Sequence, residues 1–290
     1  MNNLPAYDEG MARALTFADH DRGLDRNRYV YAVVSRRARG LSIGVNLNPD
    51  KKCNFDCPYC QVDRTTPGGP ADIDVALLAA ELEALLGRAR SGTLWRHPLF
   101  STAPKALQRV ADIAFAGDGE PTTPREFPAA ARAARDALGR SGLQVPLRLL
   151  TNATMLDRPR VRAALPLFDE LWCKLDAGTE SYFQRVDGTR LPFRKILDNL
   201  LSVARERPIV LQSLFLSLEG AGPSAAEIEA YAGRIRQLLD GGGRIDCVQV
   251  YTVARRPADA RVGALPDARL ESIAARVRAE GVRAEVYGAA

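Results

Sequence analysis

Three of the five cysteines of this chain lie on one short segment, at Cys53, Cys57 and Cys60, with the spacing C-x3-C-x2-C. Thiolates are soft ligands that select zinc, copper or an iron–sulfur cluster, and a segment this short can place all three around one cubane. A four-iron cluster held by three thiolates keeps one iron open, much as a catalytic metal site keeps a position for its substrate. The spacing therefore favours a reactive iron–sulfur centre.

Two other interpretations of these cysteines stay open: a zinc site completed by a distant ligand, and three structural thiols in a turn. Structural zinc sites usually pair two short hooks of Cys or His. The remaining candidate ligands are isolated from one another in the sequence: His20, His97, Cys173 and Cys247. We expect Cys173 and Cys247 to be small core residues, because free cysteine is commonly buried, and a catalytic role for Cys247 is the less favoured alternative.

An aromatic residue, Tyr59, stands directly before the last of the three cysteines. Together, Cys53, Cys57, Tyr59 and Cys60 resemble the hallmark of the radical SAM superfamily, C-x3-C-x-aromatic-C. The resemblance implies that the cysteines hold a [4Fe–4S] cluster whose open iron is chelated by the amino and carboxylate groups of S-adenosylmethionine (SAM). It also implies that the backbone of Tyr59 contacts the adenine of SAM.

A glycine-rich stretch, Ala116-Gly-Asp-Gly-Glu-Pro-Thr122, directly follows an apolar run. Glycine lets a backbone approach a ligand closely, but Pro121 and Thr122 are equally typical of a turn that starts a helix. The stretch resembles the Gly-Gly-Glu motif of the same superfamily, which implies that Gly119 and Glu120 bind SAM, with Glu120 facing its ammonium group. Asp118 stands where that motif has its first glycine, so the form here is Gly-x-Gly-Glu-Pro.

Polar residues also occur in or just after later apolar runs. We expect Asn152 to support SAM binding, or else to cap a helix or form an Asx-turn. Lys174 and Asp176 share one strand face, so they either form a structural ion pair or line the cavity for SAM and substrate, which we favour. Gln212 is a further candidate for cofactor binding, with a satisfied interior polar group as the alternative.

The elements that must position these residues alternate along the chain. From Leu41 onward, short apolar runs alternate with stretches of helical periodicity, which indicates βα units around a parallel sheet. The expected strands are Ser42–Leu47, Asp112–Ala116, Leu147–Thr151, Leu171–Asp176, Ile209–Ser217, Cys247–Val253 and Arg283–Tyr287. The expected helices are Ala76–Arg90, Arg125–Gly139, Arg158–Leu165, Phe193–Glu206, Ala225–Leu239 and Asp267–Glu280. The pattern predicts an α/β fold, a complete or partial (β/α) barrel of six to seven parallel strands.

The length and composition of the chain limit its possible domain organisation and protein class. We expect one domain over residues 41–290, with residues 1–40 as an N-terminal extension packed on the barrel, because no loop is long enough to separate domains. The composition, with 46% hydrophobic and 26% charged residues, excludes disordered and fibrous classes of protein. The sequence shows no export signal and no long apolar run, which predicts a cytoplasmic protein without a membrane partner. The net charge of +5 gives RNA only a slight advantage as a substrate.

The resemblance, taken with these residues, predicts a radical SAM oxidoreductase or modifying enzyme. It implies that the cluster cleaves SAM reductively to methionine and a 5′-deoxyadenosyl radical, which abstracts hydrogen from an RNA base or a small metabolite, with flavodoxin or ferredoxin as the electron donor. The motifs look closest to the branch that includes the wyosine-base tRNA-modifying enzyme, yet no cysteine precedes Cys53 to hold that enzyme's second cluster. The alternatives are an activase that places a glycyl radical on a partner protein, and a non-enzymatic metal-binding barrel.

Overall fold

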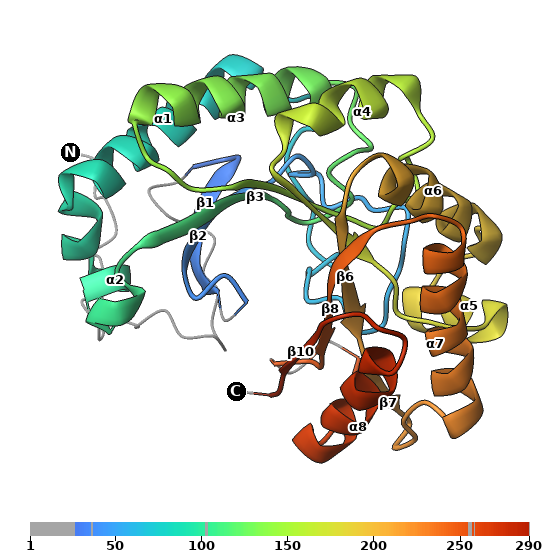
Figure 1. Ribbon diagram of the computed structural model, residues 1–290. Helices are drawn as coiled ribbons and strands as arrows, with labels where there is room; N and C mark the ends of the chain where they lie inside the picture. The colour runs from blue at the N-terminus through green and yellow to red at the C-terminus, as the bar shows by residue number, and fades with distance from the viewer. Residues whose placement is uncertain (1–26, 36, 102–103, 255–256, 258, 290) are drawn as a thin grey trace.

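The computed structural model describes residues 27–35, 37–101, 104–254, 257 and 259–289 of the chain. Within them, eight strands form one curved sheet in the order β1-β2-β3-β4-β5-β6-β8-β10 (Figure 1). From β2 to β10 every neighbouring pair is parallel. These strands are β2 (Gly40–Val45), β3 (Val110–Phe115), β4 (Leu147–Thr151), β5 (Glu170–Lys174), β6 (Ile209–Leu214), β8 (Ile245–Tyr251) and β10 (Ala284–Tyr287). The predicted α/β fold, a partial barrel with seven parallel strands, is confirmed.

Helices cover the outer side of the curved sheet (Figure 1). They are α1 (Val75–Ser91), α2 (Pro98–Ser101), α3 (Phe127–Ser141), α4 (Pro159–Ala164), α5 (Glu180–Asp187), α6 (Phe193–Glu206), α7 (Ala225–Asp240) and α8 (Asp267–Arg278), with short 3-10 turns η2 (Thr93–Arg96), η3 (Lys105–Leu107) and η4 (Leu165–Leu167). In the part of the chain that the structure describes, no helix is both long enough and apolar enough to span a membrane.

The alternation of side chains along β5 shows how the sheet separates two environments. Leu171, Cys173 and Leu175 lie in the main hydrophobic core. Trp172 lies in a small separate cluster with Val210 and Cys247, because successive residues of a strand face opposite sides of the sheet. Cys173 and Cys247 are both buried, which confirms the expectation that they are core residues.

The first strand, β1 (Val30–Ser35), forms one edge of the sheet and pairs antiparallel with β2, with Val33 opposite Ser42. It belongs to the segment predicted as an N-terminal extension, of which residues 1–26 lie outside the described residues. Strand β10 forms the other edge, and within the described residues β1 and β10 do not pair. The barrel is therefore open between these two edge strands.

The strand predicted over Ile209–Ser217 is two strands, so this prediction was wrong. Strand β6 ends at Leu214, and β7 (Leu216–Leu218) pairs antiparallel with β9 (Val262–Ala264) in a separate two-stranded sheet. The backbone N–H of Phe215 donates to the carbonyl of Tyr251 at 2.8 Å, and the chain leaves the barrel after this bond. The apolar run continues through the break, so the sequence carries no local signal for it.

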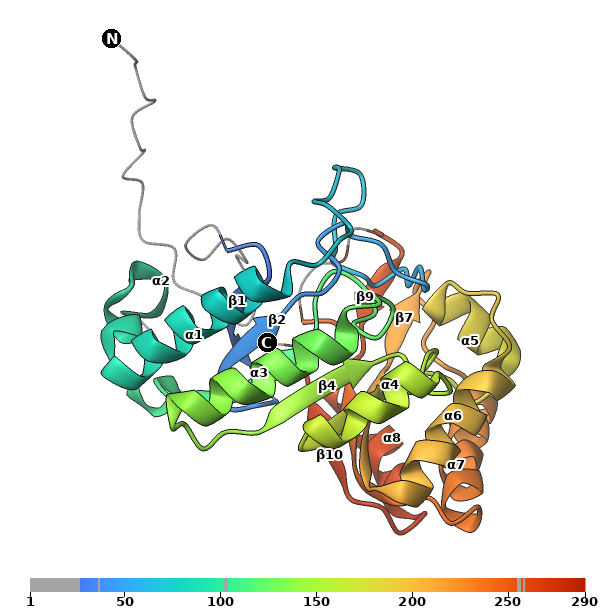
Figure 2. The same ribbon diagram turned by 90° about the horizontal axis from the view of Figure 1, so that it is seen from above.

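The loops that follow β2, β3, β4 and β5 all leave the sheet at its carboxyl end, because these strands are parallel. In Figure 2 the blue segment that follows β2 extends past this end toward β7, β9 and α5. The topology thus gathers the cysteine segment and the polar residues that follow β3, β4 and β5 at the end of the sheet where β/α barrels place their sites.

Candidate functional site

The segment after β2 carries Cys53, Cys57 and Cys60 as free, half-buried thiols. The backbone N–H of Cys60 donates to the carbonyl of Cys57 at 2.9 Å, which folds the last four residues into a tight turn. Cys57 Sγ lies 3.6 Å from the carbonyl oxygen of Asp187, at the end of α5. Cys60 Sγ accepts a hydrogen bond from Arg64 Nη1 at 3.3 Å, so a cation stands beside a thiol that would be negative as a metal ligand.

Two glycines let other loops press against the cysteine segment. A Cβ on Gly119 would stand 2.0 Å from the carbonyl oxygen of Lys52, the residue before Cys53. A Cβ on Gly188 would stand 1.9 Å from the carbonyl oxygen of Asp56, and the φ of Gly188 is +57°. These contacts fix the backbone on both sides of Cys53, and only glycine leaves room for them.

We expect Gly119→Ala to reduce the retention of iron by roughly 10–100-fold, because the added methyl group must push the backbone before Cys53 out of place. Iron and acid-labile sulfide would be measured after anaerobic reconstitution of the full chain. The matched control is Gly139→Ala in α3, where an added Cβ meets no atom within 4 Å. Equal iron contents in the two variants would contradict the role given to Gly119.

Glu120 is buried after β3 and receives four hydrogen bonds. Its Oε1 accepts from the hydroxyl and backbone N–H of Thr122 and from Thr151 Oγ1, and its Oε2 accepts from the backbone N–H of Asn152 at 2.7 Å. Burial raises the pKa of Glu120, while the hydrogen bonds from Asn152, Thr122 and Thr151 oppose the rise. Its Oε2 receives a single bond and keeps capacity for another donor, such as an ammonium group.

Asn152 connects the end of β4 to the cysteine segment through a closed ring of side chains. Its Nδ2 donates to Asn54 Oδ1 at 2.7 Å, Asn54 Nδ2 donates to Thr154 Oγ1 at 2.6 Å, and Thr154 Oγ1 donates back to Asn152 Oδ1 at 2.7 Å. Asn54 directly follows Cys53, so the ring sets the position of the first cysteine. Contact of Asn152 with SAM stays a prediction.

Lys174 forms the ion pair with Asp176 that the sequence offered as one of two alternatives. Its Nζ also lies 2.8 Å from Asp187 Oδ1 and 4.5 Å from the centre of the Tyr59 ring. Tyr59 in turn donates its hydroxyl to Asp176 Oδ2 at 2.5 Å. Burial alone lowers the pKa of Lys174, but the carboxylates of Asp176 and Asp187 outweigh it and raise that pKa well above its usual value. The amine is therefore held protonated.

Asp187 and Arg64 are the contacts of the cysteine segment that the sequence analysis missed. Asp187 ends a helix that was not among the predicted elements, α5, which is only eight residues long but is amphipathic and is bounded by the N-cap Thr179 and by Gly188. Arg64 is one of many arginines, and nothing in its neighbours distinguishes it. Both act through tertiary contacts, which the spacing of residues along the chain does not reveal.

The other candidate residues lie apart from these contacts. Gln212 is buried and donates its Nε2 to Gln249 Oε1 at 3.0 Å, and its role in cofactor binding stays a prediction. His97 lies against the ring of Phe100, and His20 lies outside the described residues. Among the residues that the structure describes, no three His, Cys, Asp or Glu side chains are grouped to hold a single metal ion. Three half-buried thiols on one short segment suit a cluster, which spans more space than one ion.

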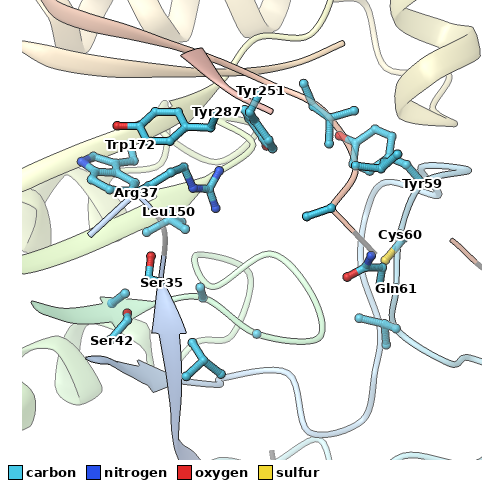
Figure 3. Close-up of a pocket in the computed structure, with 18 of the residues that line it drawn as sticks. Ser35, Arg37, Ser42, Tyr59, Cys60, Gln61, Leu150, Trp172, Tyr251 and Tyr287 are labelled. Atoms are coloured by element: carbon cyan, nitrogen blue, oxygen red, sulfur yellow. The ribbon is translucent and has the colours of Figure 1, made fainter. Parts of the chain in front are cut away.

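A cavity of about 410 Å³ lies inside the curved sheet, with Tyr59, Cys60 and Gln61 of the cysteine segment forming one wall (Figure 3). The inner faces of the strands supply further walls, including Trp172 and the residues of β1 and β10 at the open edge. Arg148 contacts two of the residues that line the cavity. Its Nη1 pairs with Asp112, and its guanidinium lies 4.6 Å from the centre of the Trp172 ring. A small molecule in this cavity would lie beside the third cysteine.

Comparison with known proteins gives relatives of modest identity. No family model matches the chain. A UPF0026 protein of Helicobacter pylori is 26% identical over 215 residues, 72% of this chain and 62% of that protein. A protein described as GTPase Obg from Brachyspira hyodysenteriae is 24% identical over 256 residues, 86% of this chain and 33% of that protein. The chain thus spans between a third and about three fifths of the length of these curated relatives.

Solved structures match over most of the chain. A radical SAM methyltransferase from Sphaerobacter thermophilus superimposes with a TM-score of 0.63 at 18% identity, over 89% of this chain and 68% of that chain. The chain has the fold of radical SAM enzymes. A structure of TYW1 with a lysine-pyruvate adduct bound gives a TM-score of 0.56 at 12% identity, over 88% and 87% of the two chains. SuiB of Streptococcus suis bound to S-adenosylmethionine gives 0.54 at 14% identity, over 87% and 49%.

Proposed function

We propose that this protein is a radical SAM enzyme in which Cys53, Cys57 and Cys60 hold a [4Fe–4S] cluster and SAM binds its open iron. The observation that carries the proposal is the place of the three thiols: they follow the first parallel strand of a radical SAM fold, and the last of them, Cys60, lines the interior cavity. The chemistry that the bound cluster and SAM supply is one-electron cleavage to methionine and a 5′-deoxyadenosyl radical, which takes a hydrogen atom from the substrate.

In this proposal the residues of the chain would bind and orient SAM and surround the reacting atoms. Glu120 Oε2 would accept from the ammonium group of SAM, with Gly119 beside it, and Asn152 would support the same cofactor. The backbone of Tyr59 would contact the adenine, while its hydroxyl is fixed by Asp176. The cavity walls would shield the reacting atoms from water on the sides that they cover, since a reactive radical must meet its substrate before solvent. A cytoplasmic electron donor such as flavodoxin or ferredoxin belongs to this proposal.

The test is anaerobic reconstitution of the full chain with iron and sulfide, followed by dithionite and SAM. We expect about four irons per chain by the cluster assignment, and 5′-deoxyadenosine detected by chromatography. A chain that retains iron and sulfide but releases no 5′-deoxyadenosine would overturn the enzyme and leave a metal-binding barrel. Transfer of a radical to a co-purified protein would replace the small substrate with a glycyl-radical partner.

We expect Glu120→Gln to weaken SAM binding by about 10–100-fold, because it removes the charge that would face the SAM ammonium group. The affinity for SAM would be measured by calorimetry on the reconstituted protein. The matched control is Glu83→Gln in α1, where the carboxylate is half exposed and paired with Arg140. Native SAM affinity in Glu120→Gln with iron retained would contradict the role of Glu120.

The cavity limits the size of the group that can react, whether that group belongs to a metabolite or to an RNA. Its volume of about 410 Å³ suits a metabolite or a single base. A lysine-pyruvate adduct is described for TYW1, but Lys174 does not offer the equivalent chemistry here. A lysine that attacks a carbonyl must lose its proton, and Asp176 and Asp187 hold Lys174 protonated. We therefore assign Lys174 a structural role, in which it pairs with the two carboxylates beside the cysteine segment. We do not assign the reaction of the wyosine branch to this chain.

A further inference from the structure

One cationic side chain of the interior cavity has no described counter-ion. The lining includes two side chains of opposite formal charge, Arg37 and Asp112. The carboxylate of Asp112 is paired with Arg148. No carboxylate in the described parts of the chain forms an ion pair with Arg37. Among the charged side chains that line the cavity, Arg37 is therefore the one without a described ionic partner.

One nitrogen of the Arg37 guanidinium also lacks a hydrogen-bond acceptor. Its Nη1 is buried and makes no hydrogen bond. The group lies 4.6 Å from the centre of the Tyr251 ring, and Figure 3 shows it extended toward the open space between Tyr251 and Cys60. A buried donor without an acceptor costs about 1–3 kcal/mol, and more for a charged group. A ligand that brings an anionic oxygen to Arg37 would recover this cost.

The walls around Arg37 describe the rest of such a ligand. Aromatic rings of Trp172, Tyr251 and Tyr287 stand around the guanidinium (Figure 3). Flat rings prefer to pack on aromatic walls, whereas a hydrated, flexible chain gains little there. Asp112, which also lines the cavity, has one buried carboxylate oxygen, Oδ1, without a hydrogen-bond partner in the structure.

We propose that Arg37 anchors the carboxylate or phosphate of a small, flat substrate, and so directs the other end of that substrate toward the cysteine segment. This inference rests on the proposed function for the reaction, but the anchoring itself is a binding property. Tyr59, Cys60 and Gln61 lie across the open space from Arg37 (Figure 3). An acid held at Arg37 would therefore place its far end beside the third cysteine.

The test compares ligands that differ only in the anchored group. 2-Naphthoate, 2-naphthyl phosphate and neutral 2-naphthamide would be titrated by calorimetry into the reconstituted full chain, with and without saturating SAM. We expect at least one of the two anions to bind about 10-fold or more tightly than the amide, as a charge-assisted bond to Arg predicts. The tighter anion identifies whether the substrate carries a carboxylate or a phosphate.

Variants of Arg37 complete the test. Arg37→Gln should remove the preference for the anion, and Arg37→Lys should restore part of it. Arg194→Gln, an exposed charge change in α6, should keep the native preference. The inference is overturned if the native protein binds acid and amide equally, if Arg37→Gln keeps the preference, or if saturating SAM displaces the anion from Arg37. Because no SAM cleavage is measured, a negative result here is distinct from the failure of the radical chemistry.

Discussion

Cys57→Ala should lose its iron and its ability to cleave SAM. Two thiolates cannot replace the three that the cluster needs, and substitutions that merely touch a metal ligand already cost about 10–100-fold, so the loss should exceed 100-fold. Cys57 is also the thiol that lies against Asp187, and it is not among the described residues that line the cavity. Iron, labile sulfide and 5′-deoxyadenosine would be measured on preparations reconstituted side by side.

The matched control removes a sulfur that is not a ligand. Cys173→Ala empties a small volume in the main core, which should cost about 1 kcal/mol of stability and leave iron and cleavage at native values. Native activity in Cys57→Ala would exclude a cluster on this segment. One zinc per chain without labile sulfide in the native protein would instead make Cys53, Cys57 and Cys60 a structural metal site.

The sequence predicted the parallel strands well because each is an apolar run bounded by polar turns. Strand β4 has the predicted bounds, Leu147–Thr151, and helix α6 has the predicted bounds, Phe193–Glu206. In both segments the hydrophobic period alone decides the element, so local information suffices. The break after Leu214 was missed because it depends on the pairing of β7 with β9, whose two strands are far apart in the sequence.

The sequence predicts three cysteines for the candidate site, but it does not predict the charged residues around them. Cys53, Cys57 and Cys60 are close in sequence, so their spacing alone predicts that they share a site. Arg37 follows the edge strand β1 and lines the cavity, whereas Asp187 ends the short helix α5 and contacts the cysteine segment. Only the assembled sheet brings these two charges to their places.

Lys174→Met should destabilise the protein by roughly 3–5 kcal/mol, the usual cost of removing one partner from a buried ion pair. The substitution leaves the carboxylates of Asp176 and Asp187 buried close to each other with no ammonium between them. In a chain of this size the loss corresponds to a decrease of roughly 10 °C in the melting temperature. Circular dichroism melting of the full chain, prepared identically for each variant, measures it.

Two further variants test whether the stability loss of Lys174→Met comes from the missing charge or from altered packing. Lys195→Met removes a partly exposed lysine that pairs with Asp157 at 3.3 Å, and should cost less than about 1 kcal/mol. Combining Lys174→Met with Asp187→Asn removes one of the two buried carboxylates that the lysine neutralises. The double variant should recover part of the lost stability, because the two positions interact directly. Equal melting temperatures for Lys174→Met and Lys195→Met would show that the buried pair does not hold α5 against the cysteine segment. A large loss of stability in Lys174→Met, with partial recovery in the double variant, would show that the shared ammonium stabilises the contact between α5 and Cys57.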